Sequence, residues 1–240
     1  MNSKLFFIVI LAKDNIKNTS KMKNLLRTSI LSAAVASLVL VSCGQDKPVT
    51  SETTEVTTTK DGNAYVLDTL NSKIEWKGYK VFKSENTSHF GTITFESGDL
   101  TVKDGKLESG KFVASMNSLT ATDLKDDAEM QAKLDGHLKA DDFFDVANFP
   151  TASYEITKVT ENASGDYNTT LEGNMTIKGI TKPVKFNANV TVNNGEVTIA
   201  TEPTDVNREE YGVKFQAPAE NGVVKNEITL QISIKALETK

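Results

Sequence analysis

Apolar and polar residues alternate along most of the chain from Tyr65 onwards. An alternation with a period of two is typical of a β-strand that buries one face and exposes the other to water. In the clearest case, 184–192, every second residue is apolar and the intervening residues are Lys, Asn and Thr. The same pattern marks 228–236 and the shorter segments 74–78, 93–95, 112–116, 154–156, 171–177 and 197–199. The sequence therefore predicts many strands, each with one buried face.

Short polar segments that contain glycine separate the alternating segments. Asn-Gly, Asp-Gly and Ser-Gly-Asp sequences favour tight turns between antiparallel strands. They occur at 97–99, 104–105, 164–166, 193–195 and 221–222. Many one-sided strands joined by tight turns predict an antiparallel sheet, and we expect it to close, or nearly to close, into a barrel. Residues 64–240 are enough for one such domain with an ample core.

One segment, 123–139, breaks the alternation and is rich in residues that favour helices. Three of its apolar residues are spaced by four and therefore share one helical face: Met130, Leu134 and Leu138. Thr122 or Asp123 is the expected N-cap, because side-chain oxygens of these residue types accept hydrogen bonds from a helix N-terminus. We predict a single short helix inserted between strands.

The segment that joins this helix to the next strand, 137–154, contains three phenylalanines. Phe143 and Phe144 are adjacent, lie among acids and belong to no alternating run. Pro150 prevents helix continuation and biases Phe149 towards an extended backbone. We predict that Phe143 and Phe144 are buried and seat this connection on the hydrophobic body of the domain.

Residues 1–42 have the features of a signal peptide, and we suspect that its true start is Met22. A basic segment, 22–27, precedes an apolar segment, 28–41, that is too short to span a bilayer. The Leu-Val-Ser-Cys sequence that ends at Cys43 resembles the lipobox of bacterial lipoproteins, in which the cysteine is acylated and becomes the new N-terminus. The alternative is an ordinary signal peptide followed by an incidental cysteine. We favour lipidation of Cys43, which would anchor the protein to a membrane without spanning it.

Residues 43–63 are predicted to be a lipidated tether. Their only bulky apolar residues are Val49 and Val56, so they bury too little apolar surface to offset the entropy lost on folding. No dense run of acids after Cys43 signals export to the cell surface. We expect a lipid-anchored protein of the bacterial cell envelope that faces the periplasm.

The formal charge of the whole chain is −5. Removing the six Lys or Arg and the one Asp of residues 1–42 leaves 21 basic and 31 acidic side chains, a net charge near −10. Binding of nucleic acid needs clustered Lys and Arg, so a nucleic-acid partner is not expected. The sequence also lacks the Lys- and Arg-rich amphipathic helix that binds anionic lipid surfaces.

The residue types that most often carry chemistry form no recognisable site. His89 and His137 are the only histidines, and neither belongs to an HxH, HxxE or HExxH motif. The acids of 123–145 form no calcium-binding loop, and no G-x-S-x-G, phosphate-binding or dinucleotide-binding motif occurs. Cys43 is the only cysteine, so its acylation leaves no thiol for catalysis or metal binding. We expect a protein that is not an enzyme and that uses no metal and no cofactor.

Arg208 lies in a polar segment, 205–212, between predicted strands. Its guanidinium either forms an ion pair with an acid of the 137–154 segment or binds the polar head group of a ligand. We favour the ion pair. His89 is the second candidate for a head-group or structural role.

Six segments, in order along the chain, resemble the YceI-like family, also called lipid- or polyisoprenoid-binding proteins. Two of them are His-Leu-Lys-Ala-Asp-Asp-Phe-Phe-Asp at 137–145, with Phe-Pro-Thr following at 149–151, and Gly-Asn-Met-Thr-Ile-Lys-Gly-Ile-Thr-Lys-Pro-Val at 173–184. The others are 65–68 with 74–76, 89–95 with 98–100, 208–212 and 226–230. The chain departs from the family at Glu210, which stands where the family's Arg-x-Asp-aromatic-Gly motif has its acid.

The resemblance implies an all-β fold, a lipocalin-like antiparallel β-barrel with one short helix inserted between strands. It also implies a long apolar channel that binds a polyisoprenoid or another long-chain amphipathic lipid, an envelope location, and no settled enzymatic activity. The residues that we expect to line the channel are Trp76, Tyr79, Phe95, Phe112, Met116, Phe143, Phe144 and Phe186.

Two alternatives stay open. The ligand is a fatty acid or fatty amide, or else side chains fill the interior and the domain is a structural or protein-interaction module, since a small barrel either fills its interior or holds one ligand. The expected partners are a long-chain lipid and, through the N-terminal lipid anchor, a membrane. The sequence leaves a homodimer open.

Overall fold

The computed structural model describes residues 53–57, 59–162 and 164–239. The predicted signal peptide, Cys43 and the first part of the predicted tether lie outside these residues. The described part is mostly β-structure with one α-helix, and none of its helices is long and apolar enough to cross a membrane.

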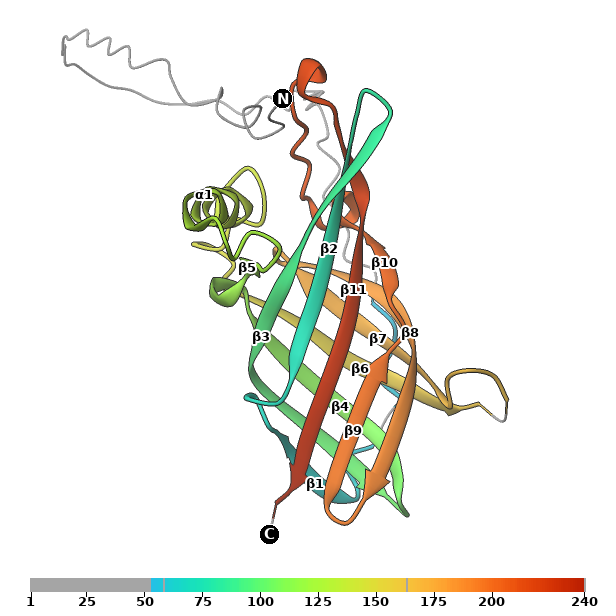
Figure 1. Cartoon of the computed structure of the whole chain (residues 1–240). Coiled ribbons are helices and arrows are strands. Elements are labelled where there is room, and N and C mark those ends of the chain that lie inside the picture. The colour runs from blue at the N-terminus through green and yellow to red at the C-terminus, as the bar shows by residue number, and fades with distance from the viewer. Residues whose placement is uncertain (1–52, 58, 163, 240) are drawn as a thin grey trace, which may run out of the picture. The chain divides into compact units, whose positions relative to one another are not determined.

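Eight antiparallel strands form a closed ring (Figure 1). In order around the ring they are β2 (Lys73–Phe82), β3 (Glu85–Lys103), β4 (Lys106–Ser115), β6 (Thr151–Glu161), β7 (Thr169–Ile177), β8 (Ile180–Asn193), β9 (Glu196–Thr201) and β11 (Val223–Glu238). Pairing of β9 with β11, for example of Ile199 with Ile234, closes the ring. The prediction of an antiparallel sheet that closes into a barrel is confirmed, and closure removes the free edges that an open sheet would expose.

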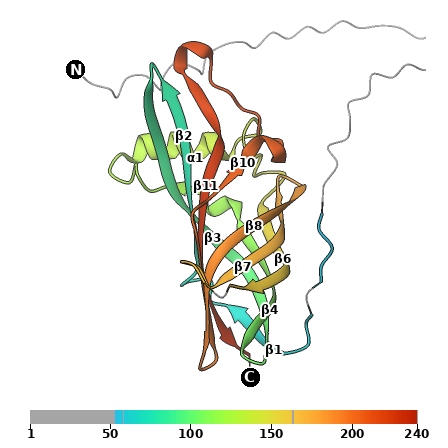
Figure 2. The ribbon, with the colours of Figure 1, turned by 90° about the vertical axis from the view of Figure 1, so that its right-hand side faces the viewer.

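Three short strands extend this ring. At the lower end in Figure 1, β1 (Asn63–Leu67) pairs with both β11 and β3. It therefore lies between the same two strands as β2. β10 (Thr204–Asn207) pairs with β11, and β5 (Thr120–Ala121) pairs with β3. At the upper end the β2–β3 hairpin and the start of β11 project past the ring (Figures 1 and 2).

The residues that the alternation assigns to the buried face form one continuous core. Its large members from the ring strands include Phe95, Leu100, Phe112, Tyr154, Ile156, Leu171, Phe186, Ile199 and Ile232. The ring centroids of Phe95 and Phe112 are 6.1 Å apart, and those of Tyr154 and Phe186 are 5.3 Å apart. Burial of these side chains supplies the main driving force for closing the barrel.

One predicted turn is wrong. The segment 97–99 lies inside β3, which continues without a turn for 19 residues. A Cβ atom at Gly98 would lie 2.9 Å from the Phe112 ring and 3.1 Å from the Leu67 side chain, so glycine here permits close packing instead of a turn. The predicted turns at 104–105 and 193–195 are found, with the positive φ angles that two-residue hairpin turns require.

The helix α1 (Ala128–Lys139) begins five residues later than predicted. Its N-cap is Asp127, whose side chain accepts a hydrogen bond from the Met130 N–H. The predicted cap, Asp123, instead accepts a hydrogen bond from the main chain of β3 at Phe90. The predicted apolar face does turn towards the protein, since Leu138 is buried and Met130 and Leu134 are half-buried. The described residues also form the 3₁₀-helices η2 (Met116–Ser118), η3 (Arg208–Tyr211) and η4 (Ala219–Asn221).

Candidate functional site

The upper end of the barrel has an inner wall formed by β2, β3 and β11 (Figure 1). Trp76 of β2 lies on this wall, half-buried and packed against the core. Gly78 faces the same way, because alternate residues of a strand point to one side. A Cβ atom added to Gly78 would meet no atom within 4 Å. Open space therefore borders the inner wall next to Trp76.

Three polar groups lie along the same wall. The indole nitrogen of Trp76, Nε1, is buried and has no hydrogen-bond partner among the described residues. His89 pairs with Gly78 and so shares its side, and its Nδ1 lies 2.8 Å from Oδ2 of Asp123. Lys80 is next on this face of β2, and partial burial lowers the pKa of its ammonium group. The wall thus combines apolar surface with a buried N–H donor and a basic side chain.

The 137–154 segment is fixed to the connection that precedes β11. Four aromatic side chains, called the joint cluster below, make this contact: His137, Phe143, Phe144 and Phe215. The ring centroids of His137 and Phe215 are 4.5 Å apart, and those of Phe143 and Phe215 are 5.8 Å apart. Phe143 is buried, as predicted, whereas Phe144 is only half-buried.

Arg208 lies beside the joint cluster with 1% of its surface exposed. Its Cζ is 5.8 Å from the centroid of the Phe143 ring. The guanidinium donates hydrogen bonds to four acceptors, which are the carbonyl oxygens of Val213, Val224 and Lys225 and Oδ1 of Asn226. Burial lowers the pKa of Arg208, but a guanidinium is so basic that it stays a cation. The predicted ion pair of Arg208 with an acid of 137–154 is therefore wrong, because main-chain carbonyl groups and a side-chain amide accept the hydrogen bonds of the guanidinium.

The other predicted channel residues do not gather at the inner wall. Four of them, Phe95, Phe112, Met116 and Phe186, are buried members of the core. Tyr79 lies on the opposite face of β2 from Trp76, where its hydroxyl is 2.9 Å from Oγ1 of Thr229. Lys77 places its Nζ 5.3 Å from the centroid of the Tyr79 ring on that outer face. The structure therefore separates Tyr79 from the inner wall.

Sequence reasoning misses Gly78 and Lys80 as site residues. Both residues lie at alternate positions after Trp76 and therefore on the same face of β2. This alternation is the signal in the sequence that identifies them. Asp123 is missed as the partner of His89, because the contact joins residues 34 apart in the chain and on different elements.

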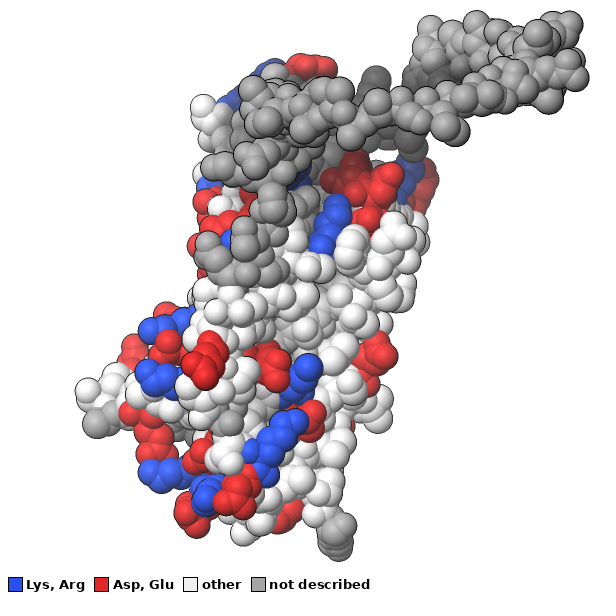
Figure 3. Space-filling model, turned by 180° about the vertical axis from the view of Figure 1, so that it is seen from behind, with Lys and Arg blue, Asp and Glu red and all other residues white. Residues whose placement is uncertain are grey.

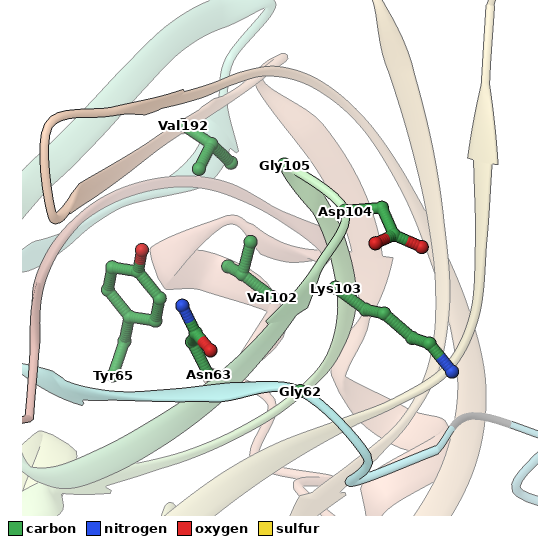
Figure 4. A pocket seen from close by; sticks show the side chains of 8 residues that line it. All are labelled: Gly62, Asn63, Tyr65, Val102, Lys103, Asp104, Gly105 and Val192. Atoms are coloured by element: carbon green, nitrogen blue, oxygen red, sulfur yellow. The ribbon is translucent and has the colours of Figure 1, made fainter.

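A separate pocket of about 420 Å³ lies at the lower end of the barrel (Figure 4). It is lined by Gly62, Asn63, Tyr65, Val102, Lys103, Asp104, Gly105 and Val192. Lys103 forms an ion pair with Asp61, with Nζ 2.8 Å from Oδ2. Charged and main-chain groups at this pocket do not suit a long apolar chain, so we place the candidate site at the upper end.

The face seen in Figure 3 and the side-chain clusters of the described residues bear on two other ligand classes, nucleic acids and metal ions. On the face seen in Figure 3, acidic and basic side chains interleave and leave wide uncharged areas between them. This face carries no basic stripe of the kind that binds nucleic-acid phosphates. Among the residues that the structure describes, no group of three or more His, Cys, Asp or Glu side chains is placed to hold a metal ion.

Comparison with known proteins gives matches in both sequence and structure. The family model of the YceI-like domain matches residues 65–236. A UPF0312 protein from Shewanella denitrificans is 29% identical over 138 residues, which are 55% of this chain and 64% of the relative. A UPF0312 protein from Pseudomonas putida is 30% identical over 177 residues, which are 70% of this chain and 86% of the relative. The crystal structure of BcnA from Burkholderia cenocepacia shares the fold, with a TM-score of 0.55 and 18% identity over 70% of this chain and 98% of BcnA.

Proposed function

Since the chain belongs to the YceI-like family, we propose that its barrel binds a long-chain amphipathic lipid non-covalently at the upper end and catalyses no reaction. The observation that carries this proposal is the open space beside Gly78, on the same wall as the half-buried Trp76. Burial of apolar ligand surface contributes about 0.8 kcal/mol for each CH₂ group. Ten such groups offer roughly 8 kcal/mol before the costs of ordering the ligand are subtracted.

The polar groups of the wall suit the head group of an amphipathic ligand. The indole N–H of Trp76 is a donor without a partner among the described residues, and a buried donor left unsatisfied costs about 1–3 kcal/mol. An oxygen of a ligand head group would satisfy it, while Lys80 supplies a basic side chain on the same face. A polyisoprenoid is the ligand class that we favour, with a fatty acid or fatty amide as the alternative.

A filled barrel is the second candidate, in which the domain is a structural or protein-interaction module. The continuous core that includes Phe95, Phe112 and Phe186 favours it for the middle of the barrel. Native mass spectrometry of protein purified without detergent separates the two functions. A co-purified or newly bound lipid supports the carrier, whereas a protein that takes up no long-chain lipid supports the filled barrel.

Replacement of Gly78 by leucine should weaken lipid binding at least tenfold. The new side chain would occupy the open space beside Trp76, yet its Cβ meets no existing atom, so the free energy of unfolding should change by less than about 1 kcal/mol. Delipidated protein is titrated with a long-chain polyprenol, and binding is read from the fluorescence of Trp76, the only tryptophan. Urea denaturation of the same samples gives the stability.

Lys77→Leu is the matched control, because it adds the same side chain to the exposed, opposite face of β2. It should leave the dissociation constant unchanged. Equal binding by Gly78→Leu and the wild type would move the site away from this wall, and a wild type that binds no long-chain ligand would contradict the proposed function.

We also propose that Cys43 is lipidated and that the protein is anchored in the cell envelope, facing the periplasm. Support comes from the lipobox-like sequence before Cys43 and from the apolar segment that precedes it. Metabolic labelling with an alkyne fatty acid should mark the wild type and leave Cys43→Ala unlabelled and released from the membrane. A wild type that takes no label would overturn this anchor without bearing on lipid binding in the barrel.

A further inference from the structure

Part of the predicted tether is bound to the outside of the barrel. The main-chain N–H of Thr54 donates a hydrogen bond of 2.8 Å to Oδ1 of Asn174 on β7. The Nδ2 of Asn174 in turn donates a hydrogen bond of 2.8 Å to the carbonyl oxygen of Thr54. The side-chain amide of Asn174 thereby pairs with both the main-chain N–H and the main-chain carbonyl of Thr54, as the main chain of a neighbouring strand would.

A second contact lies where β6 and β7 fall out of register. The pairing shifts between Ile156 and Lys158, so Thr157 is the extra residue of a β-bulge. An extra residue of this kind is left out of the ladder of strand hydrogen bonds. The carbonyl oxygen of Thr157 accepts hydrogen bonds from the N–H of Thr57 at 3.1 Å and from its hydroxyl at 2.7 Å. The bulge thus offers an acceptor that the tether uses.

Asn174 is covered where it contacts this segment. Gly173 and Met175 belong to the inward face of β7, so alternation directs Asn174 outwards. Outward polar side chains of a barrel are normally wet, yet Asn174 is only 9% exposed. Among the described residues, the Asn174 side chain forms hydrogen bonds only with Thr54. The contact with Thr54 therefore accounts for the position of the Asn174 side chain.

We propose that residues 53–57, called the wall segment below, are a docking element that holds the barrel close to its membrane anchor. The membrane part of this inference rests on the proposed lipidation of Cys43. An extended chain spans at most about 3.5 Å per residue, so a free tether from Cys43 to Ala64 would reach roughly 70 Å. With the wall segment bound, the length of chain between Cys43 and Thr53 sets the greatest reach, which falls to roughly 35 Å.

Hydrogen–deuterium exchange of the full chain in detergent tests the docking itself. The N–H groups of Thr54 and Thr57 should exchange at least tenfold more slowly than in a peptide of residues 49–60. Asn174→Ala should raise the exchange rate of the Thr54 N–H at least tenfold. Thr176→Ala is the matched control, because Thr176 lies two residues along the same face of β7 and bonds to Thr181, not to the wall segment; it should leave the rate unchanged. Peptide-like exchange of both groups in the wild type would overturn the proposal.

Energy transfer from Trp76 to dansyl-labelled lipid head groups tests the effect on distance. The lipidated protein is reconstituted in vesicles, and Trp76 is its only tryptophan. Asn174→Ala should lower the transfer efficiency relative to the wild type and to Thr176→Ala, because a longer free tether lets the barrel move away. Equal transfer efficiencies in all three proteins would overturn the proposal that docking holds the barrel near the membrane. The docking itself would then be judged by hydrogen–deuterium exchange alone. A chain that takes no fatty-acid label but keeps slow exchange would retain the docking and reject the anchor.

Discussion

Arg208→Leu should lower the free energy of unfolding by about 3–5 kcal/mol. Arg208 is buried, and its guanidinium donates to Val213, Lys225 and Asn226, with the shortest bond, 2.6 Å, to the Val213 carbonyl. Leucine removes every donor, and each acceptor that water cannot then reach costs about 1–3 kcal/mol; Val213 is buried, Asn226 is half-buried and Lys225 is exposed. Urea denaturation followed by circular dichroism measures the loss.

Two further variants, Arg208→Lys and Lys214→Leu, are the controls for Arg208→Leu. Arg208→Lys keeps the charge but has no planar fork, so it should recover less than half of the loss. Lys214→Leu changes an exposed cation in the same connection and should stay within about 0.5 kcal/mol of the wild type. A loss below 1 kcal/mol for Arg208→Leu would show that water replaces the donors, and that Arg208 does not hold the connection to β11.

The acceptors of Arg208 also show why sequence reasoning named the wrong partner. Charges along a sequence suggest ion pairs, because acids are visible as residue types. Carbonyl groups left without partners at the end of a strand are not visible in this way. Here the register of β11 against β2 shifts between Val224 and Ile228, at the place where three of the four acceptors lie. A bulge of this kind is decided by the packing of the whole barrel.

Strands were predictable where one face is buried along their whole length. The alternation at 184–192 foretells β8, and that at 228–236 foretells β11, because each strand has the core on one side and water on the other. Turns were less predictable. The β2–β3 hairpin turns at Lys83 and Ser84, which have positive φ without being glycine, asparagine or aspartate. Nothing in their residue types marks a turn.

The candidate site was predictable in two of its residues, Trp76 and His89. Trp76 stands out as a large aromatic residue on an apolar face and His89 as one of only two histidines, and the structure places both on the inner wall. Phe215 of the joint cluster follows no periodic pattern, so its contact with His137 and Phe143 depends on a distant connection meeting the end of α1 and the segment after it. The hydrogen bonds of Thr54 and Thr57 were not predictable, because the composition of the tether argues against a bound segment.

Gly91→Ala should lower the free energy of unfolding by about 3–5 kcal/mol and shift the emission of Trp76 in the folded protein. A Cβ atom at Gly91 would lie 1.8 Å from the carbonyl oxygen of Thr120 and 2.8 Å from Cζ2 of Trp76. The first neighbour is main chain, so relief requires β5 to leave its pairing with β3, and the indole to move from the wall. Thermal and urea denaturation, together with emission spectra, measure both effects.

Gly78→Ala is the matched control for this variant. Gly78 and Gly91 lie two pairs apart in the β2–β3 ladder, and neither has a positive φ, so alanine strains neither backbone. At Gly78 the new methyl group meets no atom, and the reduced entropy of the unfolded chain should make this variant neutral or more stable by up to about 1 kcal/mol. The difference between the two variants therefore isolates the contact of Gly91 with Thr120 and Trp76. Similar free energies of unfolding for the two variants would mean that β5 does not pack against the inner wall. Residues outside β5 would then have to hold Trp76 beside the open space.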